Sequence, residues 1–245
     1  MSNAHLFAVH TSEALRQSDN RIQVKDQDAW SRITQILRLQ ANAAIILFDS
    51  KTVLTVALDD LASSKKHVIS GTVTAQRLVS PLRPAINLYI GLTKREAFEA
   101  IVYTAGQLGV SSVKPIHTQK THRNWITAKD LTRLSNIAIA GCEQAKQFAL
   151  PNIEPVQSFE AIITTTSGNP GIVCEPTGTN CVALSQKLKE QNLTELDLWI
   201  GPEGGFSAAE LQHLQNLGII PMALTPTILR SQDAVLVALG LLRAT

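Results

Sequence analysis

LDLWIGPEGGFSAAELQHL, residues 196–214, is an apolar run followed by a glycine-rich loop and then by the start of a helix. Ser207 and Glu210 make an S-x-x-E capping box, which predicts that this helix begins at Ala208. Glycine leaves no Cβ between the backbone and a neighbour, so the loop can be a tight turn or can close over a ligand. Its spacing matches neither the G-x-G-x-x-G fingerprint nor a P-loop.

Strand-like and helix-like segments alternate on both sides of this loop, from about residue 85 to the end of the chain. Alternation of this kind predicts a mainly parallel sheet between helices, with ligands bound outside the carboxyl ends of the strands. The glycine-rich loop directly follows one such strand. The predicted strands are 85–92, 111–117, 171–175, 196–200 and 219–224, and the predicted helices are 94–108, 128–150, 182–191, one beginning at 208, and 229–242.

The first part of the chain has a different pattern. Short apolar runs at strand-like spacing surround a single helix, for which Asp26 is the expected N-cap. Several short strands with one helix predict a small barrel, and the prolines of VSPLRPAIN, residues 79–87, indicate a connector. We therefore expect two domains, a β-barrel over residues 1–74 and an α/β domain over residues 75–245.

Composition is that of a soluble globular protein, with 44% apolar and 17% charged residues. No apolar stretch is long enough for a membrane span, and no secretory signal is visible. The three cysteines form no C-x-x-C pair, so reduced thiols and a cytoplasmic location are expected. Residues 1–150 hold 18 lysines and arginines against 11 acidic residues, whereas residues 151–245 hold 4 against 9. This asymmetry is compatible with a polyanionic partner for the first part, or with unevenly solvated faces.

Four further stretches, taken with the first, resemble one known family. IGPEGGFS is followed by a strand, then by L-x-x-x-x-LR and a terminal helix. AIAGCEQAKQFALPNI, AGQLGV with KPIHTQKTHR, and RITQILRLQANAAIILFD precede them in the family's order. Together they resemble the uridine N3-methyltransferases of small-subunit ribosomal RNA, the RsmE family of the knotted SPOUT superfamily. The resemblance spans essentially the whole chain, and G-P-E-G-G is its most specific part.

The resemblance implies a PUA-like barrel that binds RNA, joined to a SPOUT α/β domain with a trefoil knot. It also implies a homodimer that acts on 16S ribosomal RNA or on the small ribosomal subunit. S-adenosylmethionine would be held in the knot, mostly by backbone groups of three loops, and the glycines would clear space for its nucleoside end. Carried onto this chain, the cofactor-binding residues are Cys174, Glu175, Pro176, Ile200, Gly201, Pro202, Glu203, Gly204, Gly205, Leu224, Ile228 and Leu229.

Methyl transfer to N3 of uridine needs the N3 proton to leave, and a nearby cation would stabilise the resulting negative charge on O2 and O4. Arg230, next to the third loop, is the catalytic candidate, with a phosphate clamp or a helix-start salt bridge as alternatives. Arg32, Arg38 and Arg123 are the candidate RNA-binding residues. No metal is expected, because no cysteine or carboxylate completes a zinc set with the histidines of HTQKTH, residues 117–122.

The chain departs from the family pattern at several positions. The glutamate usual after L-R-T is Gln232, and His5, Gln107 and Gln147 also replace the usual residues. The cofactor loop is thus kept better than the RNA-contacting positions, so either the RNA is held differently or the substrate or activity has diverged. Two further hypotheses remain at this point: an RNA-binding ribosome-assembly factor without turnover, and a dinucleotide-dependent oxidoreductase, which would lack its glycine fingerprint.

Overall fold

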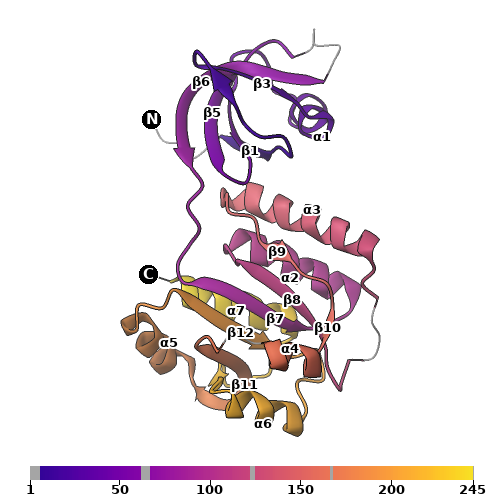
Figure 1. Ribbon diagram of the computed structural model, residues 1–245, viewed down its shortest axis with the longest axis vertical. Helices are drawn as coiled ribbons and strands as arrows, with labels where there is room; N and C mark the ends of the chain where they lie inside the picture. Colours follow the sequence, from indigo (N-terminus) through magenta and orange to yellow (C-terminus); the bar gives the residue numbers. More distant parts are fainter. Residues whose placement is uncertain (1–5, 62–66, 122–124, 166–167, 245) are drawn as a thin grey trace. The chain divides into compact units, whose positions relative to one another are not determined.

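The computed structural model describes residues 6–61, 67–121, 125–165 and 168–244. The chain divides into two compact units (Figure 1). Unit 1 comprises Met1–Ser80 and Lys146–Ala149, and unit 2 comprises Pro81–Ala145 and Leu150–Thr245. Each unit has its own sheet, with one apolar core in unit 1 and two in unit 2.

Unit 1 contains a six-stranded sheet whose ladders are antiparallel except for that between β1 and β4. A closed barrel would need a ladder between the end strands β1 and β2, and the described residues show none. The strands in spatial order are β1 (Phe7–His10), β4 (Ala44–Phe48), β5 (Thr52–Leu58), β6 (Val68–Leu78), β3 (Arg21–Lys25) and β2 (Gln17–Ser18).

The expected boundary between residues 74 and 75 falls inside β6. This strand stays paired with β5 as far as Leu78, which lies opposite Thr52. Unit 1 therefore continues to Ser80. The mostly polar end of β6 gave no apolar alternation from which its full length could be predicted.

The helix predicted at Asp26 is present, but it changes its winding after one turn. The Asp26 side chain accepts a hydrogen bond from the Ala29 amide, and α1 (Gln27–Ser31) begins as expected. The chain then enters a π-helix, η2 (Arg32–Ile36). Because a π turn holds more residues than an α turn, the apolar positions drift off the buried face, and Ile36 is 72% exposed.

Unit 2 confirms the predicted parallel sheet: every ladder in it is parallel. The spatial order is β10-β8-β7-β12-β11-β13, and β9 pairs with β8. The strands are β7 (Ala85–Gly91), β8 (Ser112–His117), β9 (Asn152–Ile153), β10 (Gln157–Ser158), β11 (Gly171–Asn180), β12 (Glu195–Ile200) and β13 (Ile220–Ala223).

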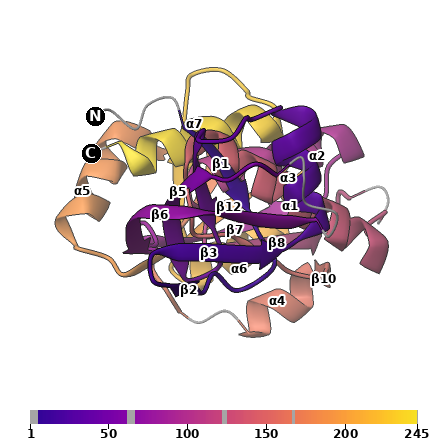
Figure 2. The ribbon, with the colours of Figure 1, turned by 90° about the horizontal axis from the view of Figure 1, so that it is seen from above.

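Helices cover both faces of this sheet (Figure 2). Along a strand, alternate residues point to opposite faces. Leu198 accordingly belongs to the core under α2 (Arg95–Gln107), α3 (Ala128–Ala145), α5 (Cys181–Glu190) and α7 (Ser231–Arg243). Its neighbour Trp199 lies in the smaller core under α4 (Phe159–Thr165) and α6 (Ala208–Asn216).

The helix predicted over 128–150 ends earlier, at Ala145. Lys146 has a positive φ of 56°, which breaks the helical path. The buried Phe148 then packs edge-on against Phe48, with ring centroids 5.0 Å apart, and lies beneath the guanidinium of Arg77. The tertiary contacts of residues 146–149 end the helix before Pro151 does.

Candidate functional site

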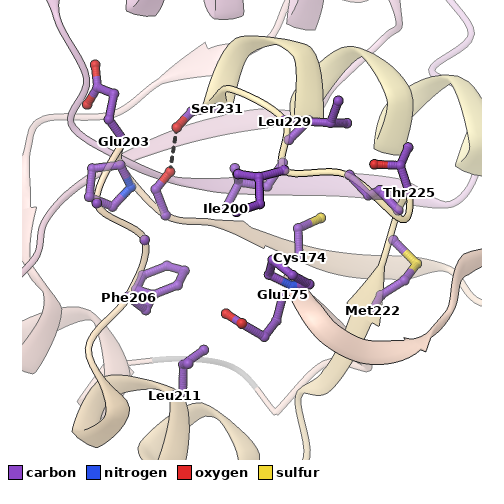
Figure 3. A pocket seen from close by; sticks show the side chains of 18 of the residues that line it. Cys174, Glu175, Ile200, Glu203, Phe206, Leu211, Met222, Thr225, Leu229 and Ser231 are labelled. Atoms are coloured by element: carbon purple, nitrogen blue, oxygen red, sulfur yellow. Dashed lines mark hydrogen bonds between the residues drawn. The ribbon is translucent and has the colours of Figure 1, made fainter.

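A cavity of about 350 Å³ lies in unit 2, at the carboxyl ends of β11, β12 and β13 (Figure 3). Three loops surround it, each directly following one of these strands or lying within the bulged end of β11. All twelve residues predicted to bind the cofactor line this single cavity. The other lining residues are Lys120, Phe206, Leu211, Met222, Thr225, Thr227, Ser231 and Ala234.

The glycine-rich loop forms the closest-packed wall. A Cβ on Gly201 would lie 2.9 Å from the Cα and carbonyl carbon of Gly205, so only glycine permits this approach. Gly205 has a φ of +68° and donates its amide to the Pro202 carbonyl at 2.8 Å. The Ser231 hydroxyl, from the start of α7, donates to the Gly201 carbonyl at 2.9 Å. The loop is therefore a tight turn in its own right and also a cavity wall.

The outer side of the loop rests on the end of β7. A Cβ on Gly91 would lie 2.3 Å from Cδ of Pro202, so the two backbones are in contact. The Glu203 carboxylate accepts a hydrogen bond from the Lys94 amide at 3.1 Å. These contacts fix the loop to the first turn of α2.

The capping box predicted from the sequence is confirmed. Ser207 Oγ accepts from the Glu210 amide at 3.3 Å, and Glu210 Oε2 accepts from the Ser207 amide at 2.7 Å. The second carboxylate oxygen of the buried Glu210 accepts from the Gln119 amide at 2.8 Å. One carboxylate thus joins α6 to the loop that follows β8.

Lys120, in that same loop, is a cavity residue that the sequence interpretation did not identify. Its Nζ donates to the carbonyls of Gly204 and Phe206, at 2.9 and 3.0 Å. A Cβ on Gly204 would lie 3.3 Å from Cβ and Cδ of Lys120, so a larger residue there would press on the lysine where it lies across the loop. The sequence signal for Lys120 was a cationic residue just beyond the carboxyl end of β8, because ligand-binding sites in parallel sheets form at the carboxyl ends of the strands.

The remaining walls come from β11 and β13. Their pairing shifts register between Cys174 and Thr179, and this bulge turns Cys174–Pro176 toward the cavity. Burial raises the pKa of the Cys174 thiol to about 12, so it stays protonated at neutral pH. Figure 3 shows Ile200, Met222 and Leu229 around the space, opposite the carboxylate of Glu175. A chamber whose walls combine apolar side chains with polar side-chain and backbone groups suits a flat heteroaromatic ligand that carries polar atoms.

The sequence of unit 2 places this geometry in a known family. Residues 80–243 match the profile of the RNA methyltransferase domain. The chain belongs to the RNA methyltransferase domain family. Membership of this family rejects the hypothesis of a dinucleotide-dependent oxidoreductase.

Relatives of this RNA methyltransferase domain protein confirm the predicted RsmE resemblance. Ribosomal RNA small subunit methyltransferase E from Synechocystis is 28% identical, over 86% of this chain and 69% of the relative. The protein of the same name from Buchnera aphidicola of Acyrthosiphon pisum is 24% identical, over 86% and 83%.

Solved structures share the fold. Ribosomal RNA small subunit methyltransferase E from Neisseria gonorrhoeae, bound to S-adenosylmethionine, has a TM-score of 0.79 at 22% identity, over 96% of each chain. A Legionella pneumophila structure described as a methyltransferase with bound S-adenosylmethionine has a TM-score of 0.82 at 20% identity, over 97% of each chain.

Of the predicted catalytic and RNA-binding residues, the structure describes Arg230, Arg32 and Arg38, and none of these three lines the cavity of the methyltransferase domain. Arg230 is the exposed N-cap residue of α7, and its chain neighbours Leu229 and Ser231 are both lining residues. Arg32 is half-buried in η2 of unit 1, and Arg38 is exposed with a φ of 51°. Arg123 lies outside the described residues, as do His5 and His122.

Within the described part of the chain, no group of three histidine, cysteine or acidic side chains could hold a metal ion. No helix found among those residues has both the length and the apolar character needed to cross a bilayer.

Proposed function

We propose that this protein transfers a methyl group from S-adenosylmethionine to N3 of a uridine in 16S ribosomal RNA. The observation that carries the proposal is the convergence of the twelve predicted cofactor residues on one cavity at the carboxyl ends of three parallel strands. The names of the relatives support a ribosomal RNA substrate, and the bound ligands of the solved relatives support the cofactor.

The volume and lining of the cavity support binding of the nucleoside end of this cofactor. The volume falls at the lower end of the range of small-molecule sites, roughly 300–1,000 Å³. A Cβ on Gly205 would meet no atom within 4 Å, so the glycine leaves open space beside the loop. Cys174, Gly204 and Leu224 come from the three loops assigned to the cofactor and would hold it, mainly through backbone groups. When bound, S-adenosylmethionine supplies an activated methyl group.

For the acceptor we assign Arg230 the role of stabilising negative charge on O2 and O4 of the uridine after N3 has lost its proton. Its exposure and its position between two cavity-lining residues support this role. Replacing Arg230 with alanine is expected to lower kcat by about 10²-fold or more. The affinity for S-adenosylmethionine should stay unchanged, as isothermal titration calorimetry would measure, because Arg230 lies outside the cavity lining.

We further propose the division of labour and the assembly implied by the family. Unit 1, a PUA-like module, would bind RNA through Arg32 and Arg38, and Arg123 from the sequence of unit 2 would add a third contact. The basic balance of the first part of the chain supports this. Unit 2 would thread the trefoil knot of the SPOUT superfamily around the cofactor. Leu236 and Val237 on α7 are 54% and 38% exposed, and a second copy of the chain would cover them in a homodimer. The reaction would take place in the cytoplasm.

The decisive experiment is transfer of a tritiated methyl group to small ribosomal subunits isolated from cells that lack this modification. The proposal predicts label in 16S RNA, at a uridine that becomes methylated on N3. Binding of subunits without label would instead indicate an RNA-binding assembly factor. Label at another atom would contradict the N3 assignment.

A further inference from the structure

Lys120 reaches the cofactor loop from outside the three loops that carry the predicted site. It lies in the turn after β8, where the Thr121 amide donates to the Thr118 carbonyl. Among the described residues that line the cavity, it is the only lysine, arginine or histidine. Its ammonium has three N–H donors, and two of them meet the carbonyls of Gly204 and Phe206.

With these two hydrogen bonds, alternate peptide groups along the loop are held at both their C=O and their N–H ends. A peptide group is planar, so its C=O and the following N–H point in opposite directions. The 204–205 peptide is fixed at both ends, by Lys120 at the Gly204 carbonyl and by Pro202 at the Gly205 amide. The 206–207 peptide is fixed in the same way, by Lys120 at the Phe206 carbonyl and by Glu210 at the Ser207 amide.

The 203–204 and 205–206 peptides, on either side of the 204–205 peptide, alternate with these fixed peptides. For the 203–204 and 205–206 peptides, the described part of the chain provides no hydrogen-bond partner to either the amide or the carbonyl. Buried or ligand-facing backbone groups require partners, so the amides and carbonyls of these two peptides are available to polar atoms of a ligand. The fixed peptides set the orientation of the available ones.

We propose that Lys120 is a positioning residue, which orients the 203–204 and 205–206 peptides for the ligand by holding the carbonyls of Gly204 and Phe206. The identity of the ligand, S-adenosylmethionine, rests on the proposed function; the ordering of the loop does not. Hydrogen bonds from an ammonium are stronger than those between neutral groups, so one side chain can hold both carbonyls.

The first arm of the test measures the loop without ligand. Lys120→Met keeps the aliphatic stem beside Gly204 but removes the charge and the donors, whereas Lys120→Arg keeps both. Lys129→Met is the matched control, because Lys129 is exposed and has no described hydrogen bond or ion pair. Amide hydrogen exchange of Gly205 and Ser207 should accelerate about tenfold in Lys120→Met and stay at the wild-type rate in the control.

The second arm measures ligand affinity by calorimetry. Lys120→Met should weaken binding of S-adenosylmethionine and of S-adenosylhomocysteine by the same factor, about tenfold, and Lys120→Arg should recover most of it. An equal factor is expected because the loop orders backbone groups and does not read the sulfonium charge. A larger effect for one ligand would overturn the positioning role in favour of direct charge contact.

The two arms separate the inference from the proposed function. Wild-type exchange rates in Lys120→Met would refute the positioning role, whatever the ligand. Accelerated exchange in a protein that binds neither ligand would support the loop ordering and refute the assigned cofactor. Unchanged affinity in Lys120→Met, with normal binding by the wild type, would refute the inference alone.

Discussion

Gly201→Ala tests the packing of the cofactor loop most severely. The added methyl carbon would lie 2.9 Å from the Cα and the carbonyl carbon of Gly205 and from the amide nitrogen of Phe206. All three are backbone atoms, so the strain cannot be relieved by a side-chain rotation. Overpacking of this kind costs about 2 kcal/mol of unfolding free energy. In a domain of this size that lowers Tm by about 4–8 °C.

Opening of the loop should also reduce cofactor affinity. If the shift forfeits about 1.4 kcal/mol of binding free energy, the Kd for S-adenosylmethionine rises about tenfold. Thermal unfolding and calorimetry measure the two effects separately. Gly240→Ala is the matched control, because a Cβ at this position in α7 meets no atom within 4 Å. Alanine is the better helix former, so this control should raise stability by about 0.5–1 kcal/mol.

Wild-type stability and affinity in Gly201→Ala would refute the close approach of Gly201 and Gly205. A loss of stability in Gly240→Ala would contradict the open space beside Gly240.

Three further predictions address other parts of the molecule. Gly204→Ala should weaken S-adenosylmethionine binding in the wild-type background but much less in Lys120→Gly, because the new Cβ would lie 3.3 Å from Cβ and Cδ of Lys120, which that variant removes; additive effects in this double-mutant cycle would contradict the contact. Arg243→Met should lower the free energy of unfolding in urea by about 2–4 kcal/mol. The half-buried guanidinium donates to the carbonyls of Leu108, Pro84 and Gly109 at 3.0, 2.8 and 2.8 Å, and the variant loses all three hydrogen bonds. Wild-type stability in this variant would refute that role. Burial raises the pKa of Asp26, but hydrogen bonds from Ala29, Ser12 and Thr11 outweigh this effect and hold the pKa below 3.8. The stability that the ionised Asp26 gives to the fold is therefore complete above that pH and is lost as pH falls through the folded pKa. Asp26→Asn should accordingly flatten the decline of Tm below about pH 4.

Local signals predicted the elements that surround the cavity. Ser207 and Glu210, which span four residues, form a capping box that predicts the start of α6, and the apolar run before Gly201 predicts a buried strand. The convergence of Cys174, Gly201 and Leu224 followed because the carboxyl ends of neighbouring parallel strands meet at one sheet edge. The family resemblance identified the three loops, and the order of β12, β11 and β13 in the sheet brings these loops together.

What the sequence could not predict depends on contacts between distant segments. Lys120 reaches Gly204 across 84 positions, and no local pattern marks that pair. The end of α3 is set by the packing of Phe148 against Phe48, which overrides five residues of helix-compatible sequence. The second function of Glu210, as acceptor for the Gln119 amide, likewise exists only in the folded chain.

The most direct test of the account is a crystal structure of this protein grown with S-adenosylmethionine. We expect the adenosine part against the backbone of residues 201–205, with polar atoms of the ligand paired to the 203–204 or 205–206 peptides. Density for the ligand at any other place, or a collapsed loop that fills this cavity with its own side chains, would contradict it.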